Sequence, residues 1–381
     1  MRVLYLVSRE NILEPGVLKS QVLDLAGQLV ENSPSTELTV LNFPSVNRFF
    51  ASLRSYQSVK RYARRMGVRL IIVPILPIGR SVMPVWAIPL FLIQTIPFVL
   101  FFALASKIDI IHARAYLSAL LAHLLRKGGL KVGFIFDMRG AYLLEGVTYG
   151  RWNRSDTSYK IWERIEKSLF SDSDRVVVQS EGLADYVKKV MPDARVELIP
   201  PCVKERDLSA GRKEREIGRK RLGVADRFVV VYSGSLGSFH EPDFLAKSYA
   251  EIRKHLPNSY FLVATHSDPK ELDSFLRKRG VPTGEFRVIL SPKDPEEVLN
   301  IGDVGLHVMG DLPITSTVIA VKFGEYLAAG LPVIVSKNLV SITDLVDKYR
   351  CGVVIDRLDQ KDVRVKMQKL VKERETIKRN A

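Results

Sequence analysis

The residues best suited to chemistry are Lys322 and Glu325, in a run that reads VKFGEYLAAGLPVI from Val321. A spacing of three puts the cation and the carboxylate on one side of a helix. Gly330 suits the end of that helix, and Pro332 prevents its continuation. A lysine at a helix N-terminus attracts a diphosphate, and a carboxylate accepts hydrogen bonds from a ribose diol. The run therefore fits a nucleotide sugar, and an ordinary surface ion pair is the alternative.

A second group of candidates follows two apolar runs in the first half of the chain. His112 and Arg114 end one run, and Asp137 and Arg139 end the next. The surrounding alternation of strand-like and helix-like segments predicts a parallel sheet, in which ligands bind at the carboxyl ends of strands. We therefore expect these side chains to gather at one site, although any one of them alone is more often structural.

A glycine-rich turn follows the predicted strand 228–232. Gly234, Ser235 and Gly237 could bring backbone N–H groups to a phosphate. The spacing is not Gly-x-Gly-x-x-Gly, so a nicotinamide dinucleotide site is disfavoured.

The organisation that must position these residues is two α/β domains. A chain of 381 residues exceeds one ordinary core. We predict an N-terminal domain over 1–203 and a C-terminal domain over 204–381. Only Cys202 and Cys351 are present, so a zinc site is unlikely and a reducing compartment is expected. We expect no secretory signal before the first predicted strand, 2–7.

Charge and hydropathy set the segment 48–107 apart. No acidic residue lies between Glu37 and Asp109, and the net charge is +15. Within this interval, Met83 to Ala105 is almost wholly apolar, long enough to span a membrane, and contains three prolines. A spanning helix and a buried core helix are the alternatives, and we favour a helix or hairpin that dips into one leaflet.

Neighbouring basic residues favour the membrane. Residues 55–66 form a predicted amphipathic helix, and such helices bind acidic lipids. A solvated face is the alternative, and nucleic acid is disfavoured because no recognised module is present. We expect a cytoplasmic protein, peripheral (monotopic) on the inner face of the cell membrane. The predicted membrane contacts are Lys60, Arg61, Arg64, Arg65, Trp86 and Phe91.

The run from Lys322 to Ile334 resembles the donor-site signature of the retaining GT-B glycosyltransferases of family 4. The resemblance implies two Rossmann-like domains facing a central cleft, with Glu325 on the ribose and Lys322 near the phosphates. Thr317 stands where many members carry an earlier Glu. We expect Thr315, Ser316 and Thr317 to contact the donor with hydroxyls and backbone N–H groups instead.

The first half also resembles this family. The run Asp109 to Arg114 is similar to a family motif whose histidine contacts the donor sugar, which implies that role for His112. The Asp137 to Glu145 loop is similar to one on the acceptor side, where we place Arg114, Asp137 and Glu145. Arg139 is a further candidate for the diphosphate, so the predicted catalytic set is His112, Arg139 and Lys322.

The predicted reaction is transfer of a sugar from a nucleotide-sugar donor to a membrane-associated lipid or lipid-linked glycan, with retention. In the family, the leaving diphosphate takes the acceptor proton, and protein groups stabilise its charge. We expect no cofactor and no metal. The alternatives are a nucleotide-sugar epimerase of the same fold and a non-catalytic partner subunit.

Overall fold

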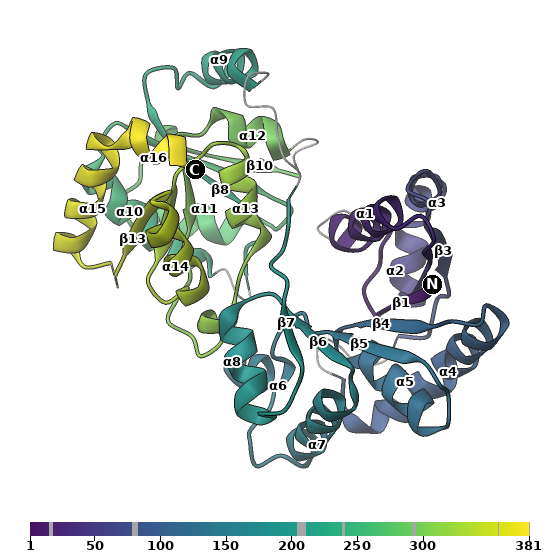
Figure 1. Cartoon of the computed structure of the whole chain (residues 1–381). Coiled ribbons are helices and arrows are strands. Elements are labelled where there is room, and N and C mark those ends of the chain that lie inside the picture. Colours follow the sequence, from purple (N-terminus) through teal and green to yellow (C-terminus); the bar gives the residue numbers. More distant parts are fainter. Residues whose placement is uncertain are drawn as a thin grey trace. The chain divides into compact units, whose positions relative to one another are not determined.

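The computed structural model describes residues 1–14, 18–77, 83–203, 211–237, 241–291, 295–356 and 358–380. The chain divides into two compact units, Met1–Pro200 and Pro201–Ala381 (Figure 1). The division thus falls three residues before the predicted domain boundary after Val203.

Unit 1 contains a parallel seven-stranded sheet in the order β3-β2-β1-β4-β5-β6-β7. Its strands are rich in β-branched and aromatic residues, as expected of a sheet covered on both faces. The order reverses between β1 and β4, which makes this the switch point of the sheet. The strands are β1 (Arg2–Ser8), β2 (Glu37–Phe43), β3 (Arg69–Ile72), β4 (Ile110–Arg114), β5 (Gly133–Asp137), β6 (Arg175–Val178) and β7 (Val196–Leu198).

Helices cover both faces of this sheet and produce two separate cores. Side chains alternate along β1, so Leu4 and Leu6 enter one core with α4, α5 and α7, while Val3, Tyr5 and Val7 enter the other with α1 and α3. The helices are α1 (Leu25–Asn32), α2 (Val46–Ala51), α3 (Tyr56–Arg65), α4 (Ile88–Ala105), α5 (Ala115–Lys127), α6 (Tyr142–Thr148), α7 (Thr157–Asp172) and α8 (Glu181–Val190).

Unit 2 contains a parallel six-stranded sheet in the order β10-β9-β8-β11-β12-β13, whose switch point lies between β8 and β11. The central strands are buried throughout. The strands are β8 (Phe228–Ser233), β9 (Ser259–Thr265), β10 (Phe286–Leu290), β11 (Val304–His307), β12 (Val333–Ser336) and β13 (Gly352–Ile355).

The helices of unit 2 also pack on both faces, with one core on each side of the sheet. The highly charged run 204–222 has the pattern of a helix; its described part, from residue 211, forms α9, and residues 204–210 lie outside the described residues. The helices are α9 (Gly211–Leu222), α10 (Pro242–His255), α11 (Lys270–Lys278), α12 (Pro295–Ile301), α13 (Val321–Ala328), α14 (Val340–Tyr349), α15 (Gln360–Lys372) and α16 (Arg374–Asn380).

The apolar segment forms one continuous helical stretch, Val85–Ala105, which is long and apolar enough to cross a membrane; a third of its most apolar window is buried. Phe91, Thr95, Val99 and Ala103 are spaced four apart and form the buried face. Phe91 is fully buried, so its prediction as a membrane contact is wrong: the helical period turns it towards the sheet. The exposed apolar face consists of Trp86, Leu90, Ile93, Phe98, Leu100, Phe101 and Leu104.

Candidate functional site

The candidate site of unit 2 lies at the switch point of its sheet, where β8 and β11 end. The glycine-rich turn follows β8 directly, and α13 packs against β11 and β12. Ligands of open parallel sheets bind at this position. The structure therefore brings the predicted turn and the Lys322–Glu325 helix to the same edge of unit 2.

Lys322 is the most perturbed cation at this edge. Its side chain is buried, its Nζ donates to the Tyr232 hydroxyl at 3.1 Å, and Nζ lies 4.2 Å from the centre of the Tyr232 ring. Burial lowers the pKa of Lys322 to about 7, against the opposing effect of the Glu325 carboxylate. A lysine desolvated in this way is suited to meet an anion, which would restore its full charge.

The glycine-rich turn is shaped around Lys322. A Cβ at Gly234 would lie 2.8 Å from Lys322 Nζ, and Gly234 also has a φ of +150°. The Tyr232 hydroxyl accepts from Lys322 and donates to the Ser235 carbonyl at 2.6 Å, which links the lysine to the turn. Ser235 is exposed, and Gly237 has a φ of +97° with open space where a Cβ would be. Gly234 thus leaves space for the end of the Lys322 side chain, and both Gly234 and Gly237 adopt a positive φ that favours glycine.

Tyr326, next to Glu325, fixes the orientation of α13. Its hydroxyl accepts from the Ser233 N–H at 2.9 Å and donates to the Leu306 carbonyl at 3.3 Å. These bonds tie the helix to both strands of the switch point. Glu325 itself is half-buried one turn along the helix from Val321.

The 3-10 turn Thr315–Thr317 differs from expectation. The hydroxyl of Thr315 donates to the Leu312 carbonyl at 2.7 Å, and that of Thr317 donates to the Ile314 carbonyl at 2.8 Å. Their N–H groups bond the same two carbonyls, and both side chains are buried. Such local bonds are the usual behaviour of threonine in turns. The expectation that these two residues donate to a sugar or phosphate is therefore wrong, whereas Ser316 is exposed.

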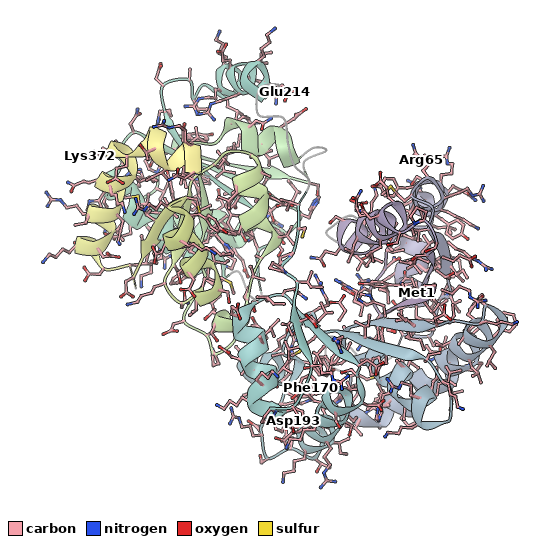
Figure 2. The ribbon with its side chains drawn as sticks, viewed as in Figure 1. Met1, Arg65, Phe170, Asp193, Glu214 and Lys372 are labelled. Carbon is pink, nitrogen blue, oxygen red and sulfur yellow. The ribbon has the colours of Figure 1, made fainter. Side chains whose placement is uncertain are left out.

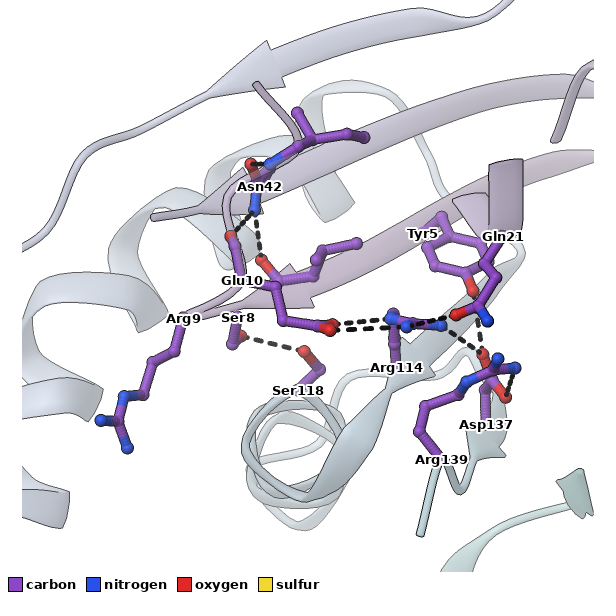
Figure 3. Close-up of polar contacts among 12 residues, drawn as sticks. Tyr5, Ser8, Arg9, Glu10, Gln21, Asn42, Arg114, Ser118, Asp137 and Arg139 are labelled. Carbon is purple, nitrogen blue, oxygen red and sulfur yellow. Dashed lines mark hydrogen bonds and ion pairs between the residues drawn. The ribbon is translucent and has the colours of Figure 1, made fainter. Parts of the chain in front are cut away.

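In unit 1, strand register gathers the predicted residues on one face. Tyr5 is paired with His112 across β1 and β4, and Arg114 with Asp137 across β4 and β5. The Tyr5 ring stacks on the His112 ring with centroids 4.3 Å apart. The Tyr5 hydroxyl donates to Asp137 Oδ2 at 2.9 Å (Figure 3). The contact between Tyr5 on β1 and Asp137 on β5 spans the intervening strand β4 and joins residues that are 132 positions apart in sequence.

Two of the predicted acceptor contacts are internal. Arg114 is buried and donates to Glu10 at 2.6 Å and to Gln21 at 2.8 Å (Figure 3). Asp137 is also buried; burial alone would raise its pKa, but the surrounding His112, Arg139 and Arg114 hold the pKa well below its usual range. Assigning Arg114 and Asp137 to the acceptor is therefore wrong, because their charges compensate each other and Glu10 inside the unit.

His112, Arg139 and Glu145 remain closer to the surface. The side chains of His112 and Arg139 are 14% and 19% exposed, and Arg139 lies 3.3 Å from Asp137 Oδ1. Glu145 is half-buried on α6, and burial raises its pKa. A Cβ at Gly140 would collide with the Glu145 carboxylate, so that glycine allows the carboxylate to lie over the loop.

The basic and apolar segments flank the edge strand β3. Helix α3 packs on one face of the sheet and α4 on the other. Arg69 of β3 lies over the Phe102 ring of α4, 5.9 Å from its centre. Figure 2 shows Arg65 on the outer side of α3. Trp86 and all four predicted basic contacts on α3 are exposed: Lys60, Arg61, Arg64 and Arg65.

A basic cavity of about 430 Å³ lies elsewhere in unit 2, beside the starts of β8 and β11. Its arginines bond internal groups: Arg219 contacts Asp303 at 3.0 Å and the Ile301 carbonyl at 2.9 Å, and Arg215 contacts Asp303 at 2.6 Å. We interpret this cavity as part of the attachment of α9, because it lies at the opposite end of the strands from the glycine-rich turn.

The expectation of a metal-free site overlooked one Asp-x-Asp triplet, Asp172-Ser173-Asp174. Asp172 lies 3.0 Å from His123, and Asp174 accepts from Arg126 at 2.9 Å and from the Phe134 N–H at 2.7 Å. Arg126 and Lys127 also lie 4.0 and 3.9 Å from Asp172, so protein cations already face both carboxylates. Among the described residues, no group of three or more His, Cys, Asp or Glu side chains is arranged to hold a metal ion.

Sequence reasoning missed Tyr5 and Tyr232, the partners of Asp137 and Lys322. Each is a tyrosine inside an apolar strand, and a buried tyrosine hydroxyl usually finds a hydrogen-bond partner. That is the only signal in the sequence, and it does not reveal which residue the partner is.

Comparison with known proteins finds a family match in each unit. Residues 27–202 match the model of the glycosyl transferase 4-like domain. Residues 315–379 match that of the glucosyltransferase 3-like C-terminal domain. The first half of the chain is thus similar to glycosyl transferase 4-like domains, and its C-terminal part to glucosyltransferase 3-like C-terminal domains. None of the curated proteins matches its sequence.

Solved structures share the two-domain GT-B fold over the whole chain. Sucrose-phosphate synthase from Thermosynechococcus elongatus is 16% identical, with a TM-score of 0.70 over 100% of this chain and 92% of that one. HepE from Anabaena, solved with UDP-glucose, is 14% identical, with a TM-score of 0.71 over 100% and 93%. WaaG, a glycosyltransferase involved in lipopolysaccharide biosynthesis, is 14% identical, with a TM-score of 0.67 over 100% and 94%. The predicted GT-B fold is thereby confirmed.

Proposed function

We propose that this glycosyltransferase transfers a sugar, with retention, from a nucleotide-sugar donor to a membrane-associated lipid or lipid-linked glycan. The observation that carries the donor half is the buried Lys322 beside the Gly234 turn, with Glu325 on the same helix. A diphosphate would meet Lys322 and the backbone of the turn, and the ribose diol would meet Glu325. HepE, which binds UDP-glucose, supports a nucleotide sugar as the donor class.

The chemistry assigned to these residues is charge stabilisation. As the bond between the sugar and the diphosphate breaks, negative charge grows on the departing phosphate. Lys322 and the N–H groups of the turn are suited to stabilise it. In this proposal the departing phosphate accepts the proton of the acceptor hydroxyl, and no cofactor or metal takes part. His112 contacts the sugar, Arg139 adds positive charge for the diphosphate, and Glu145 serves the acceptor side.

The first test is a thermal-shift panel of UDP, GDP, ADP, CMP and dTDP with wild type and Glu325→Ala. One nucleotide should raise the melting temperature of wild type selectively, and the variant should lose that shift. Glu297→Ala, at another charged helical position of unit 2, is the control and should keep it. No shift with any nucleotide would contradict the donor assignment.

The membrane half of the proposal rests on two features that flank β3. The first is the exposed apolar face of α4, on which Ile93 is 72% exposed and Phe101 is 63% exposed. Helix α3 adds a cluster of exposed cations, each of which contributes about 1 kcal/mol near an acidic lipid surface. The role of WaaG in lipopolysaccharide biosynthesis supports an acceptor of this class. We therefore place the protein at the cytoplasmic face of the cell membrane as a monotopic enzyme.

Flotation with vesicles tests this surface. The protein should float with phosphatidylglycerol–phosphatidylcholine vesicles, and the double variant Ile93→Asp, Phe101→Asp should stay in the pellet fraction. Val365→Asp with Val371→Asp, at exposed apolar positions of α15, is the matched control and should float like wild type. Equal flotation of the α4 variant and wild type would contradict the proposed docking surface.

A further inference from the structure

The proposed function does not use the arrangement of Tyr5, His112 and Arg114 around Asp137 Oδ2. Asp137 Oδ2 accepts from the Tyr5 hydroxyl at 2.9 Å, lies 3.7 Å from His112 Nε2 and lies 3.9 Å from Arg114 Nη1. Within the part of the chain that the structure describes, His112 Nε2 and Arg114 Nη1 are buried atoms without a hydrogen-bond partner. The Tyr5 hydroxyl is therefore the close donor that holds this oxygen, and the other two groups face it from a slightly greater distance.

The same tyrosine also fixes the plane of the histidine ring. Tyr5 is fully buried in the core that lies against α1 and α3. Its ring stacks on His112 with an interplanar angle of 28° and is directly paired with it across β1 and β4. Tyr5 thus restrains His112 in two ways. Its ring stacks on the imidazole, and its hydroxyl holds the Asp137 carboxylate that faces the imidazole.

We propose that Tyr5 and Asp137 are positioning residues for His112, which keep its Nε2–H turned inwards and present Nδ1 to the donor sugar. Asp137 is an acceptor because its neighbouring cations keep it ionised. An ionised carboxylate facing Nε2 selects the tautomer with the proton on that nitrogen. Nδ1 then carries a lone pair and can accept a hydrogen bond from a sugar hydroxyl. This inference rests on the proposed role of His112 in the site.

Three further charged side chains surround His112 and Asp137: Arg114, Arg139 and Glu10. Arg139 approaches Asp137 Oδ1, and Arg114 is held by Glu10 and Gln21. Glu10 is the more exposed carboxylate of the cluster, at 42% of its side chain, and it points to Arg114 (Figure 3). The carboxylate nearest to the His112 ring is therefore the one that Tyr5 holds.

The test needs no ligand. Full-length protein with ¹⁵N-labelled histidine has six imidazoles, and His112→Gln identifies the His112 signals by their loss. Wild type at pH 8 should show the His112 ring with its proton on Nε2 and a bare Nδ1. Tyr5→Phe should move both ring ¹⁵N signals towards the average of the two tautomers, and Asp137→Asn should move them further.

The controls separate positioning from folding. The five other histidines should keep their signals in Tyr5→Phe, which shows that the variant is folded. Tyr249→Phe removes a buried hydroxyl that bonds Ser259 at 3.2 Å in unit 2, and it should leave the His112 signals unchanged. A wild-type ring protonated on Nδ1, or unchanged His112 signals in both Tyr5→Phe and Asp137→Asn, would overturn the inference.

Turnover then distinguishes the inference from the proposed function. The nucleotide panel first identifies the donor. Tyr5→Phe should then lower kcat roughly tenfold and leave the KM for the donor unchanged. A tenfold loss of kcat corresponds to about 1.4 kcal/mol of transition-state stabilisation. Full activity of His112→Gln would remove His112 from the proposed site. Loss of activity in His112→Gln with wild-type kcat in Tyr5→Phe would overturn the positioning role alone.

Discussion

At the scale of single residues, the proposed donor site combines one desolvated cation with one carboxylate. Burial lowers the pKa of Lys322, and the negative charge of a bound diphosphate would raise that pKa again. Glu325 is suited to accept two hydrogen bonds from a diol. Their contributions to binding therefore differ in kind, since one depends on pH and the other on geometry.

Removing the carboxylate tests the geometric contribution. Glu325→Gln should weaken binding of the nucleotide selected by the thermal-shift panel by about 1.5–3 kcal/mol, the scale of hydrogen bonds to charged groups. Isothermal titration calorimetry measures the change in Kd. Binding of the 2′-deoxy nucleotide should already be weak in wild type and should change little in the variant. Equal losses for both nucleotides would contradict a ribose contact.

The pH dependence of binding tests Lys322. Because burial puts its pKa at about 7 in the free protein, Lys322 is mostly neutral at pH 8.5, and a bound diphosphate should recharge it. Binding at pH 8.5 should therefore take up a proton, and affinity should fall as pH rises from 7 towards 9. Calorimetry in buffers of different ionisation enthalpy measures the uptake. Lys322→Met should show less uptake, and proton release in wild type would contradict the assignment.

At the scale of elements, the turn after β8 and the helices of unit 1 show how local structure serves the site. Gly234 allows Lys322 to approach the turn, and Tyr326 ties α13 to the strands. In unit 1, Glu166 of α7 accepts from Tyr116 of α5 at 2.5 Å and from Tyr186 of α8 at 3.1 Å. This buried carboxylate holds three helices together.

Paired glycine variants separate close approach from backbone strain. Gly234→Ala places a Cβ against Lys322, whereas Gly237→Ala meets open space, and both positions have positive φ. Each should lower stability by about 1 kcal/mol through its backbone. Only Gly234→Ala should also abolish the proton uptake of Lys322 on nucleotide binding. Identical binding by the two variants would show that the contact with Lys322 is unimportant.

The helix junction at Glu166 predicts a pH-dependent stability. Burial raises the pKa of Glu166 from 4.5 to about 7, so its contribution to stability is complete below pH 4.5 and is lost as pH rises through 7. The free energy of unfolding of wild type relative to Glu166→Gln should fall by on the order of 3 kcal/mol between pH 4.5 and 8. Urea unfolding followed by tryptophan fluorescence measures it, because Trp86, Trp152 and Trp162 all lie in unit 1. If the difference in unfolding free energy between wild type and Glu166→Gln does not change with pH, Glu166 is not the group that titrates.

At the scale of the whole molecule, each unit has its own sheet, its own pair of cores and its own candidate site. Donor binding and membrane binding are therefore assigned to separable parts of the chain. Independent cores are what allow a domain to fold alone.

Expressing the units separately tests this division. Residues 201–381 should fold alone and should bind the nucleotide that stabilises the whole chain. Residues 1–200 should float with acidic vesicles and should give no nucleotide shift. Circular dichroism establishes that each piece is folded. Nucleotide binding by the N-terminal piece alone would contradict the assignment of donor binding to unit 2.

The sequence by itself determined the fold class and the helix that carries Lys322 and Glu325. Apolar runs of strand length alternate with helical patterns, and local spacing puts Lys322 and Glu325 on one helix, because both properties depend on neighbours in the chain. The predicted strands 2–7 and 228–232 appear as β1 and β8, each one residue longer than expected. The apolar run from Leu70 to Leu76 has the length of a strand, but β3 ends at Ile72, because Pro74 cannot donate to the ladder.

Only the tertiary structure decided which side chains reach the surface and which partners they have. Arg114 and Asp137 end strands as predicted, but their opposite charges lie on neighbouring strands and compensate each other in the interior. Phe91 belongs to the apolar segment, but its place on the helical period turns it into the core. Tyr5 meets Asp137 across three strands. Burial and pairing of this kind depend on contacts between distant segments, and no local pattern in the sequence specifies them.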